Sequence, residues 1–281
     1  MLPHNRRIER TATDAQDDAM KRLAIFAHYD SSDEIQPYIL FHVRALREVC
    51  DEVIFVSTAR LSDRETAKIR GHCVNIILKD NVGYDFGMWK HALQTIDVDA
   101  WDELVLTNSS VFGPIFPLRE SFDRMAGNAC DFWGMTGNYE IAWHLQSYFL
   151  VFRQNVLHSP AFAQFWRSVL PNGDKSETIR HYEVGLTGFL EKHGFRAGQL
   201  VDLERLRAFR IRRMLVGRSR RNPVIYYPVQ VIRCGMPYLK VAHFRDNPRN
   251  LHLDKLCRAV ERCGYDQALL RGRSTSLPTE P

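Results

Sequence analysis

The sequence lacks the long apolar run, the apolar leader and the nucleotide-binding fingerprints that would each assign it to a familiar class. Its 281 residues contain no window of 18 apolar residues, so we expect any membrane contact to be peripheral. Residues 1–20 carry charges of both signs and no apolar core, so we expect neither a signal peptide nor an anchor. The absence of G-x-G-x-x-G and of G-x-x-x-x-G-K-S/T disfavours a dinucleotide-dependent oxidoreductase and a P-loop protein.

The six cysteines lack the spacing of a metal site or of a redox pair. No two form C-x-x-C, and none follows zinc-ribbon spacing. Cys73, Cys130 and Cys234 lie among apolar residues, where a free thiol packs as a small hydrophobe. We therefore expect a reducing, cytoplasmic location, with or without peripheral contact at the inner face of the plasma membrane.

The composition is that of an ordinary globular protein, with 45% hydrophobic and 25% charged residues. Lys plus Arg exceed Asp plus Glu by five (38 − 33), which suits phosphate-bearing partners but not a dedicated nucleic-acid binder, so no nucleic-acid partner is expected. We expect an N-terminal tail (1–20), one α/β domain (21–200), a basic helical extension packed on the core (201–273) and a frayed tail (274–281).

Hydrophobic periodicity predicts strands that alternate with helices. Residues 23–28, 53–57 and 74–78 are short apolar runs typical of strands buried on both faces, and residues 37–49 have helical spacing between the first two. This order predicts βαβ units in a mixed, mainly parallel sheet flanked by helices, with ligands at the carboxyl ends of the strands. Further along the chain we expect helices near 86–96, 117–125, 159–169 and 182–193, and strands at 103–107, 132–135 and 148–152.

The segment KDNVGYDFGMWK, residues 79–90, follows a strand and begins a helix. Gly83 and Gly87 would let the backbone approach a ligand closely, and the N–H groups of a helix start favour anions such as a diphosphate. Asp80 and Asp85 can accept hydrogen bonds from ribose or sugar hydroxyls. An ordinary strand-to-helix turn capped by Asp85 explains the local pattern equally well.

Two further motifs place polar side chains beside strands. Thr107, Asn108, Ser109 and Ser110 follow an apolar strand, where four oxygen-bearing side chains can hold a nucleotide diphosphate or complete a cation's shell, although the local pattern favours a polar turn.

His144, Gln146 and Ser147 precede another strand and either face a cleft, where they would bind substrate hydroxyls, or form the solvent side of an edge strand. Glu183 begins an apolar helix, a position that the helix dipole favours whether or not the carboxylate does chemistry.

Taken in this order, these segments resemble the rhamnan synthesis protein F family, glycosyltransferases of the GT-A type. The resemblance spans about residues 21–270 and rests on NVGYDFGMWKHAL, LTNSSVFGPIFPL, HLQSYFLVF, YEVGLT, and a later NP followed by PYLK. It implies a GT-A-like α/β fold and transfer of a sugar, typically L-rhamnose from dTDP-L-rhamnose, onto a growing cell-surface polysaccharide or lipid-linked glycan. Carried over by position, the residues bordering the nucleoside would be His28, Tyr29, Asp30 and Asp80, and those bordering the diphosphate and donor sugar would be Asn81, Gly83, Tyr84, Asp85 and Gly87.

The sequence departs from the pattern of these enzymes where they hold a metal. Thr107-Asn108-Ser109 stands at the place of D-x-D, and Asn108-Ser109-Ser110 replaces the family's usual Asn-Asp-Ser, so no carboxylate remains there to hold Mg²⁺ or Mn²⁺. Either a metal is bridged mainly through the diphosphate, or cationic side chains such as Lys79, Lys90 or Arg153 neutralise the leaving group.

The second departure leaves a single carboxylate at the expected catalytic position. Glu183-Val184 replaces a paired Glu-Asp, so the resemblance implies Glu183 as the general base of an inverting transfer, with Asp131 in reserve. Such a base typically contributes about 10²–10⁴-fold to the rate. The missing carboxylates also leave open a catalytically impaired protein that binds sugar nucleotides or acts as a scaffold in polysaccharide assembly.

The segment 204–221 contains eight arginines, from Arg205 to Arg221, with apolar residues between them. Such a segment can lie on an anionic membrane, which would suit an enzyme with a lipid-linked acceptor, or it can be a solvated helical face packed on the protein. The sequence favours neither.

Overall fold

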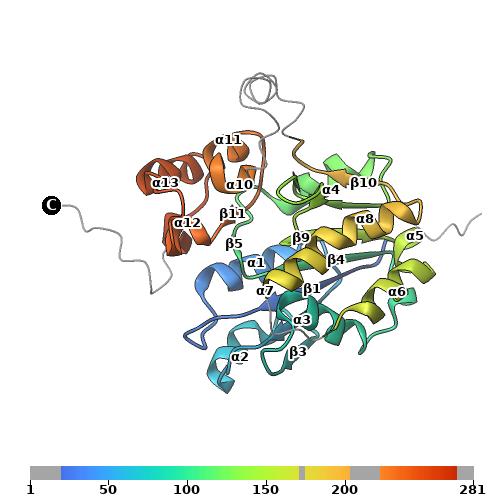
Figure 1. Cartoon of the computed structure of the whole chain (residues 1–281). Coiled ribbons are helices and arrows are strands. Elements are labelled where there is room, and N and C mark those ends of the chain that lie inside the picture. The colour runs from blue at the N-terminus through green and yellow to red at the C-terminus, as the bar shows by residue number, and fades with distance from the viewer. Residues whose placement is uncertain (1–19, 171–174, 203–221, 271–281) are drawn as a thin grey trace, which may run out of the picture.

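The computed structural model describes residues 20–170, 175–202 and 222–270 of the chain. A seven-stranded sheet forms its centre, in the order β10-β6-β9-β4-β1-β2-β3 (Figure 1). Its strands are β1 (Arg22–His28), β2 (Glu52–Ser57), β3 (Asn75–Leu78), β4 (Glu103–Asn108), β6 (Phe132–Gly134), β9 (Phe149–Arg153) and β10 (Ala197–Gln199).

One strand of this sheet runs against the others. β9 is antiparallel to both of its neighbours, β4 and β6, whereas β3, β2, β1 and β4 pair in parallel and β6 pairs in parallel with β10. The prediction of a mixed, mainly parallel sheet is therefore confirmed. The carboxyl ends of the six like-oriented strands and the amino end of β9 share one edge, which we call the carboxyl edge; the other is the amino edge.

Helices cover both faces because the central strands are apolar on both faces. Ala24 and Phe26 of β1 point into one hydrophobic cluster, and Leu23 and Ile25 point into the other. The first cluster includes α1 (Pro37–Arg47) and α4 (Leu118–Ala126), and the second includes α3 (Tyr84–Leu93), α6 (Pro160–Ser168) and α8 (Val184–Lys192). The remaining helical segments of this part are α2 (Asp63–Arg70), η1 (Val98–Ala100), α5 (Gln154–Leu157), α7 (Lys175–Thr178) and a π-helical turn, η2 (Ile179–Glu183).

The segment 222–270 packs on the α1 side of the sheet. Its strand β11 (Leu239–Lys240) pairs antiparallel with β5 (Val111–Phe112), and Tyr238 and His42 are joined by a 2.8 Å hydrogen bond between the phenol oxygen and Nε2. Figure 1 shows the helices of this segment gathered at one side of the molecule. They are α10 (Pro223–Tyr226), α11 (Pro228–Arg233), α12 (Ala242–Arg245), α13 (Leu253–Glu261) and η4 (Gln267–Leu270). The division of the chain near residue 200 stays a prediction.

Two sequence expectations need correction. β3 is an edge strand, with Leu78 49% exposed, rather than a strand buried on both faces. An apolar run indicates a strand but not how many neighbours the strand will have. Glu183 also does not lie at a free helix N-terminus, because α7, the π-helical turn and α8 follow one another without a break. The helix dipole therefore gives its carboxylate no special stabilisation.

All six cysteines are free, and Cys50, Cys130 and Cys257 are buried. Within the described ranges, no helix is long and apolar enough to cross a membrane.

Candidate functional site

A hydrogen-bond network joins the end of β4 to the start of α3. The Asn108 Nδ2 group donates to Asp85 Oδ2 at 2.8 Å, and Asn108 Oδ1 accepts from the Ser110 amide at 3.1 Å and from the Ser110 hydroxyl at 2.6 Å. Asn108 is buried, whereas Asp85 is half-buried and Ser110 is exposed. Two motifs that were separate in the sequence are therefore one structure at the carboxyl edge.

The loop before α3 is shaped by its two glycines. Gly83 precedes the helix with φ of 84°, a left-handed conformation that glycine adopts without strain. A Cβ atom on Gly87 would lie 2.5 Å from the Val82 carbonyl oxygen, so only glycine fits there. Gly83, not Asp85, holds the capping position, and Asp85 binds Asn108 instead. Tyr84 is half-buried, and Asp80 and Asn81 are exposed on this loop.

The end of β1 lies against the end of β4. The Tyr29 amide donates to Ser109 Oγ at 3.2 Å, and Ser109 Oγ donates to the Tyr29 carbonyl at the same distance. Asp30 organises the turn that follows, because its Oδ1 accepts from the Ser32 amide at 2.8 Å. The Tyr29 ring is 52% exposed, and Asp30 is half-buried.

His28, in contrast, is fully buried at the end of β1. Its Nδ1 lies 2.8 Å from Ser57 Oγ, and its ring packs against Phe55. Burial lowers the pKa of His28 to about 3, so the imidazole is neutral at physiological pH. The side chain supports the strand end and is not exposed to solvent.

Glu183 comes to the same edge through the antiparallel strand. Its Oε1 accepts from the Ser147 amide at 3.2 Å, just before β9. Burial, and after it the Glu183 charge, raise the pKa of the neighbouring Tyr148. Tyr148 is in turn tied to β4, because Thr107 Oγ1 donates to its carbonyl at 2.8 Å.

A second contact joins Glu183 to the loop that carries Asp85. The rings of Phe86 and Tyr182, the residues that follow Asp85 and precede Glu183, lie 5.8 Å apart between centroids. The structure thus gathers Asp85, Asn108 and Glu183 at the carboxyl edge.

His144, Gln146 and Ser147 reach this edge but are buried, so they do not form the solvent side of an edge strand. The Gln146 and Asn222 side chains bond to each other, with Gln146 Nε2 donating to Asn222 Oδ1 at 3.1 Å. His144 Nδ1 lies 2.8 Å from the Ala142 carbonyl oxygen. These contacts hold the segment that carries the Ser147 amide.

Asp131 lies at the opposite, amino edge. It precedes β6, which runs parallel to β4, so it is far from the ends where Asn108 and Ser109 lie. Its carboxylate accepts from Asn155 Nδ2 at 2.7 Å and from the Arg196 amide at 2.6 Å. The reserve catalytic role is corrected to a structural one, which ties β6 to the segments around it.

The cations named as substitutes for a metal all donate to main-chain carbonyls. Lys90 Nζ donates to the carbonyls of Arg167 and Val169, and Arg153 binds carbonyls around Cys130 at the amino edge. Lys79 Nζ donates to the carbonyls of Asp80 and Val82, within its own loop.

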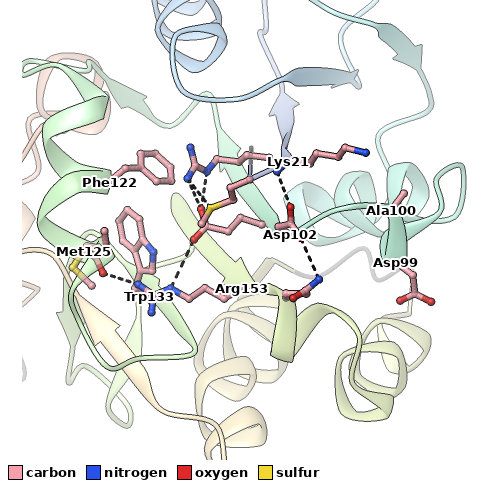
Figure 2. Close-up of a pocket in the computed structure, with 13 residues that line it drawn as sticks. Lys21, Asp99, Ala100, Asp102, Phe122, Met125, Trp133 and Arg153 are labelled. Atoms are coloured by element: carbon pink, nitrogen blue, oxygen red, sulfur yellow. Dashed lines mark hydrogen bonds and ion pairs between the residues drawn. The ribbon is translucent and has the colours of Figure 1, made fainter. Parts of the chain in front are cut away.

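A pocket of about 580 Å³ opens at the amino edge, away from these motifs. Figure 2 shows Arg153, Trp133 and Phe122 among its lining residues. Glu103 lies 2.6 Å from Arg22 and 3.7 Å from Arg153, and the Arg22 guanidinium stacks 4.0 Å from the centre of the Phe122 ring. Because these charges satisfy one another, this part of the pocket wall is a structural ion-pair network.

The donor atoms at the end of β4 do not fit a Mg²⁺ or Mn²⁺ site. The Asn108 amide oxygen already accepts two hydrogen bonds, and Ser109 is bonded to Tyr29. Divalent cations of this kind prefer carboxylates, and Asp85 is the one carboxylate of this network. In the part of the chain that the structure describes, no three His, Cys, Asp or Glu side chains gather as a metal site.

Sequence reasoning did not single out two residues at this edge, Tyr148 and Lys240. Lys240 Nζ lies 4.3 Å from the centre of the Tyr148 ring. The motifs HLQSYFLVF and PYLK contain them, but no local pattern indicates that residues so far apart in the chain meet. The arginine-rich segment 204–221 falls almost wholly on residues 203–221, outside the described residues, so its two interpretations stay predictions.

Two curated bacterial proteins are similar to parts of this chain. An uncharacterized protein, y4gN, of Sinorhizobium fredii is 29% identical over 165 residues, which are 56% of this chain and 43% of that protein. The virulence protein VirA of Vibrio anguillarum is 25% identical over 200 residues, covering 63% of this chain and 64% of VirA. The chain therefore matches between 43% and 64% of the length of these relatives.

Among solved structures, a mannosyltransferase from Pyrobaculum calidifontis in complex with GDP-mannose and Mn²⁺ aligns with a TM-score of 0.42 and 13% identity, over 90% of this chain and 86% of that one. A nucleotide-diphospho-sugar transferase from Desulfovibrio desulfuricans aligns with a TM-score of 0.39 and 12% identity, over 87% and 98%. Likenesses at these scores are too distant to assign a ligand or a reaction.

The match to a protein family is more extensive. Rhamnan synthesis protein F matches residues 53–277, which include the loop before α3, the end of β4, the segment before β9, Glu183 and Lys240. The expected α/β fold class, a mixed and mainly parallel sheet flanked by helices, is confirmed. The chain belongs to the rhamnan synthesis protein F family.

Proposed function

We propose that this chain is a glycosyltransferase that moves L-rhamnose from dTDP-L-rhamnose, with inversion, onto a growing cell-surface polysaccharide or lipid-linked glycan. Family membership supports sugar transfer. The single observation that carries the proposal is that the Glu183 carboxylate lies at the same edge of the sheet as the network of Asp85 and Asn108. An inverting displacement requires the general base and the loop that binds the donor to lie at the same site, because both act on one reacting sugar.

The nucleotide sugar would bind along the ends of β1, β3 and β4. We assign the nucleoside to Tyr29, Asp30 and Asp80, whose side chains are exposed or half-buried, with His28 supporting the strand end from inside. The diphosphate and donor sugar would lie on the loop before α3, where the start of a helix offers backbone N–H groups to an anion. That assignment covers Asn81, Gly83, Tyr84, Asp85 and Gly87, with Thr107, Asn108, Ser109 and Ser110 beside them.

Glu183 would act as the general base. The acceptor hydroxyl oxygen attacks the anomeric carbon, its proton passes to the Glu183 carboxylate, and the bond from the anomeric carbon to the diphosphate breaks on the opposite side. The Ser147 amide holds one carboxylate oxygen, which leaves the other to take the proton. We place the acceptor beside Ser147, with His144 and Gln146 fixing that segment.

The acceptor and the location are proposals of the same kind. A lipid-linked glycan would be reached at the inner face of the plasma membrane, and the segment from Arg205 to Arg221 has the charge to contact anionic lipids there.

The test is donor turnover by purified protein with dTDP-L-rhamnose and a panel of other nucleotide sugars, with Mn²⁺ or with EDTA. We expect Glu183→Gln to lower transfer or donor hydrolysis by about 10²–10⁴-fold while dTDP still binds. Glu191→Gln is the matched control, because Glu191 is an exposed glutamate on α8. Wild-type protein that binds dTDP but turns over no donor would favour the sugar-nucleotide-binding or scaffolding alternative.

A further inference from the structure

The end of β4 offers the diphosphate no strong countercharge of its own. Asn108, Ser109 and Ser110 present neutral oxygens, and the nearby carboxylate of Asp85 is an anion. When the bond to the anomeric carbon breaks, negative charge accumulates on the leaving diphosphate, so a cation near these residues would lower the barrier. Of the cations considered from the sequence, Lys90 and Arg153 bind carbonyls away from this edge, and Lys79 Nζ donates to the carbonyls of Asp80 and Val82.

Segment 222–270 brings such a cation to the site. β11 pairs with β5, and this pairing sets Lys240 opposite Val111, next to Ser110. The Val241 amide also donates to the Ser110 carbonyl at 2.9 Å. Lys240 is thus fixed by main-chain hydrogen bonds directly beside the segment that replaces D-x-D.

The Lys240 side chain reaches the Tyr148 ring, whose residue follows Ser147. Its Nζ atom lies 4.3 Å from the centre of the Tyr148 ring, a cation–π contact that orients the ammonium group. Tyr148 follows Ser147, whose amide binds Glu183, and its carbonyl accepts from Thr107. Tyr148 is therefore next to the residue that binds the proposed base and in contact with a half-buried lysine.

We propose that Lys240 binds the diphosphate of the nucleotide sugar and neutralises the charge that develops on it, the task that a divalent cation on D-x-D carboxylates would perform. This inference rests on the proposed function. The electron pair of the broken bond goes to the diphosphate oxygen, the acceptor proton goes to Glu183, and the ammonium of Lys240 keeps its protons and pairs with the leaving anion. An ammonium group is a compact charge that suits phosphate oxygens.

Binding of dTDP and dTMP in EDTA, measured by calorimetry, tests this role. Lys240→Met keeps most of the aliphatic stem but removes the charge, and we expect it to weaken dTDP binding about ten- to a hundredfold. dTMP lacks the second phosphate, so its affinity should change less than about threefold. Lys240→Arg should retain most of the dTDP affinity, and Lys255→Met, at an exposed lysine on α13, should match wild type.

The outcomes separate the two proposals. If wild type binds dTDP and Lys240→Met binds it equally well, Lys240 has no such role although the proposed function stands. If the wild-type protein does not bind dTDP, UDP or GDP, the proposed function fails and this inference fails with it. A Lys240→Met protein that lost its thermal unfolding transition would be replaced by Lys240→Gln, and equal dTDP binding by that variant would overturn the role as well.

Discussion

Asn108 is the residue on which the two polar motifs depend. Its amide nitrogen donates to Asp85 and its amide oxygen accepts from Ser110, so both ends of the side chain are used. A carboxylate in its place could accept from Ser110 but could not donate to Asp85. The neutral amide is therefore what lets the loop before α3 and the end of β4 lie together, and it is also what makes the position a poor metal ligand.

Replacing Asn108 by aspartate should place a second carboxylate within hydrogen-bond distance of the Asp85 carboxylate. We expect Asn108→Asp to lower the free energy of unfolding by about 1–2 kcal/mol at neutral pH, because like charges at this separation repel. Repulsion raises the carboxyl pKa in the folded state above the unfolded value of about 4, so the deficit relative to wild type should be largest at neutral pH, shrink as the pH falls through the raised pKa, and level off below about 4. Urea unfolding of both proteins at several pH values measures this difference in the free energy of unfolding.

Asn108→Ser is the control, because it removes the same bond without adding a second carboxylate, so its deficit should change with pH much less than that of Asn108→Asp. An Asn108→Asp protein as stable as wild type at neutral pH would contradict the network.

At the scale of elements, the loop between β3 and α3 is fixed by contact within the loop itself. Gly87 is in the first turn of α3, and its amide donates to the Gly83 carbonyl at 2.8 Å. The close approach of Gly87 to the Val82 carbonyl turns the loop back over the helix start. From the sequence we predicted that Gly87 lets the backbone approach a ligand. The structure shows that packing within the loop already requires a glycine at this position.

Gly87→Ala should therefore distort the loop before any ligand is considered. We expect a loss of about 1–3 kcal/mol in the free energy of unfolding, because the new methyl group must displace backbone. Gly71→Ala is the matched control: no atom lies within 4 Å of the new Cβ, and the φ of −74° suits alanine, so its stability should be unchanged or slightly raised. Denaturant unfolding compares them, and equal stabilities for the two variants would contradict the close approach.

At the scale of the whole molecule, two buried histidines link elements that lie far apart in the chain. His28 ends β1, and His42 lies on α1 and bonds to Tyr238 of the segment 222–270. Burial lowers the pKa of each to about 3. The unfolded chain binds these protons near pH 6.5, so the folded state is favoured above that pH and loses stability as the pH falls from about 6.5 toward 3.

The expected slope is about 1.4 kcal/mol per pH unit for each histidine below pH 6. Denaturant unfolding between pH 7.5 and 5 measures it before most carboxylates titrate. His28→Gln should remove the contribution of one histidine, whereas His252→Gln, at an exposed histidine, should leave the slope unchanged. An unchanged slope in His28→Gln would show that His28 does not carry this effect.

The elements and their order could be predicted from the sequence because they depend on local patterns. The apolar runs at β1, β2 and β4 and the helical spacing of α1 and α3 require only neighbours along the chain. The predicted ends of these strands agree with the observed ends to within one residue, and those of the two helices to within three. The motif before α3 could be placed at the carboxyl edge for the same reason, since it follows a strand and begins a helix.

Strand direction and long-range pairing were decided by the tertiary structure alone. Ser147 reaches the site because β9 runs antiparallel, and Asp131 is carried away from it because β6 does not. Lys240 arrives through the pairing of β11 with β5. The physical reason is that hydrophobic periodicity depends on residues close in the chain and indicates only which face of a strand is buried. The neighbours and the direction of the strand depend on how the buried faces of all elements pack together.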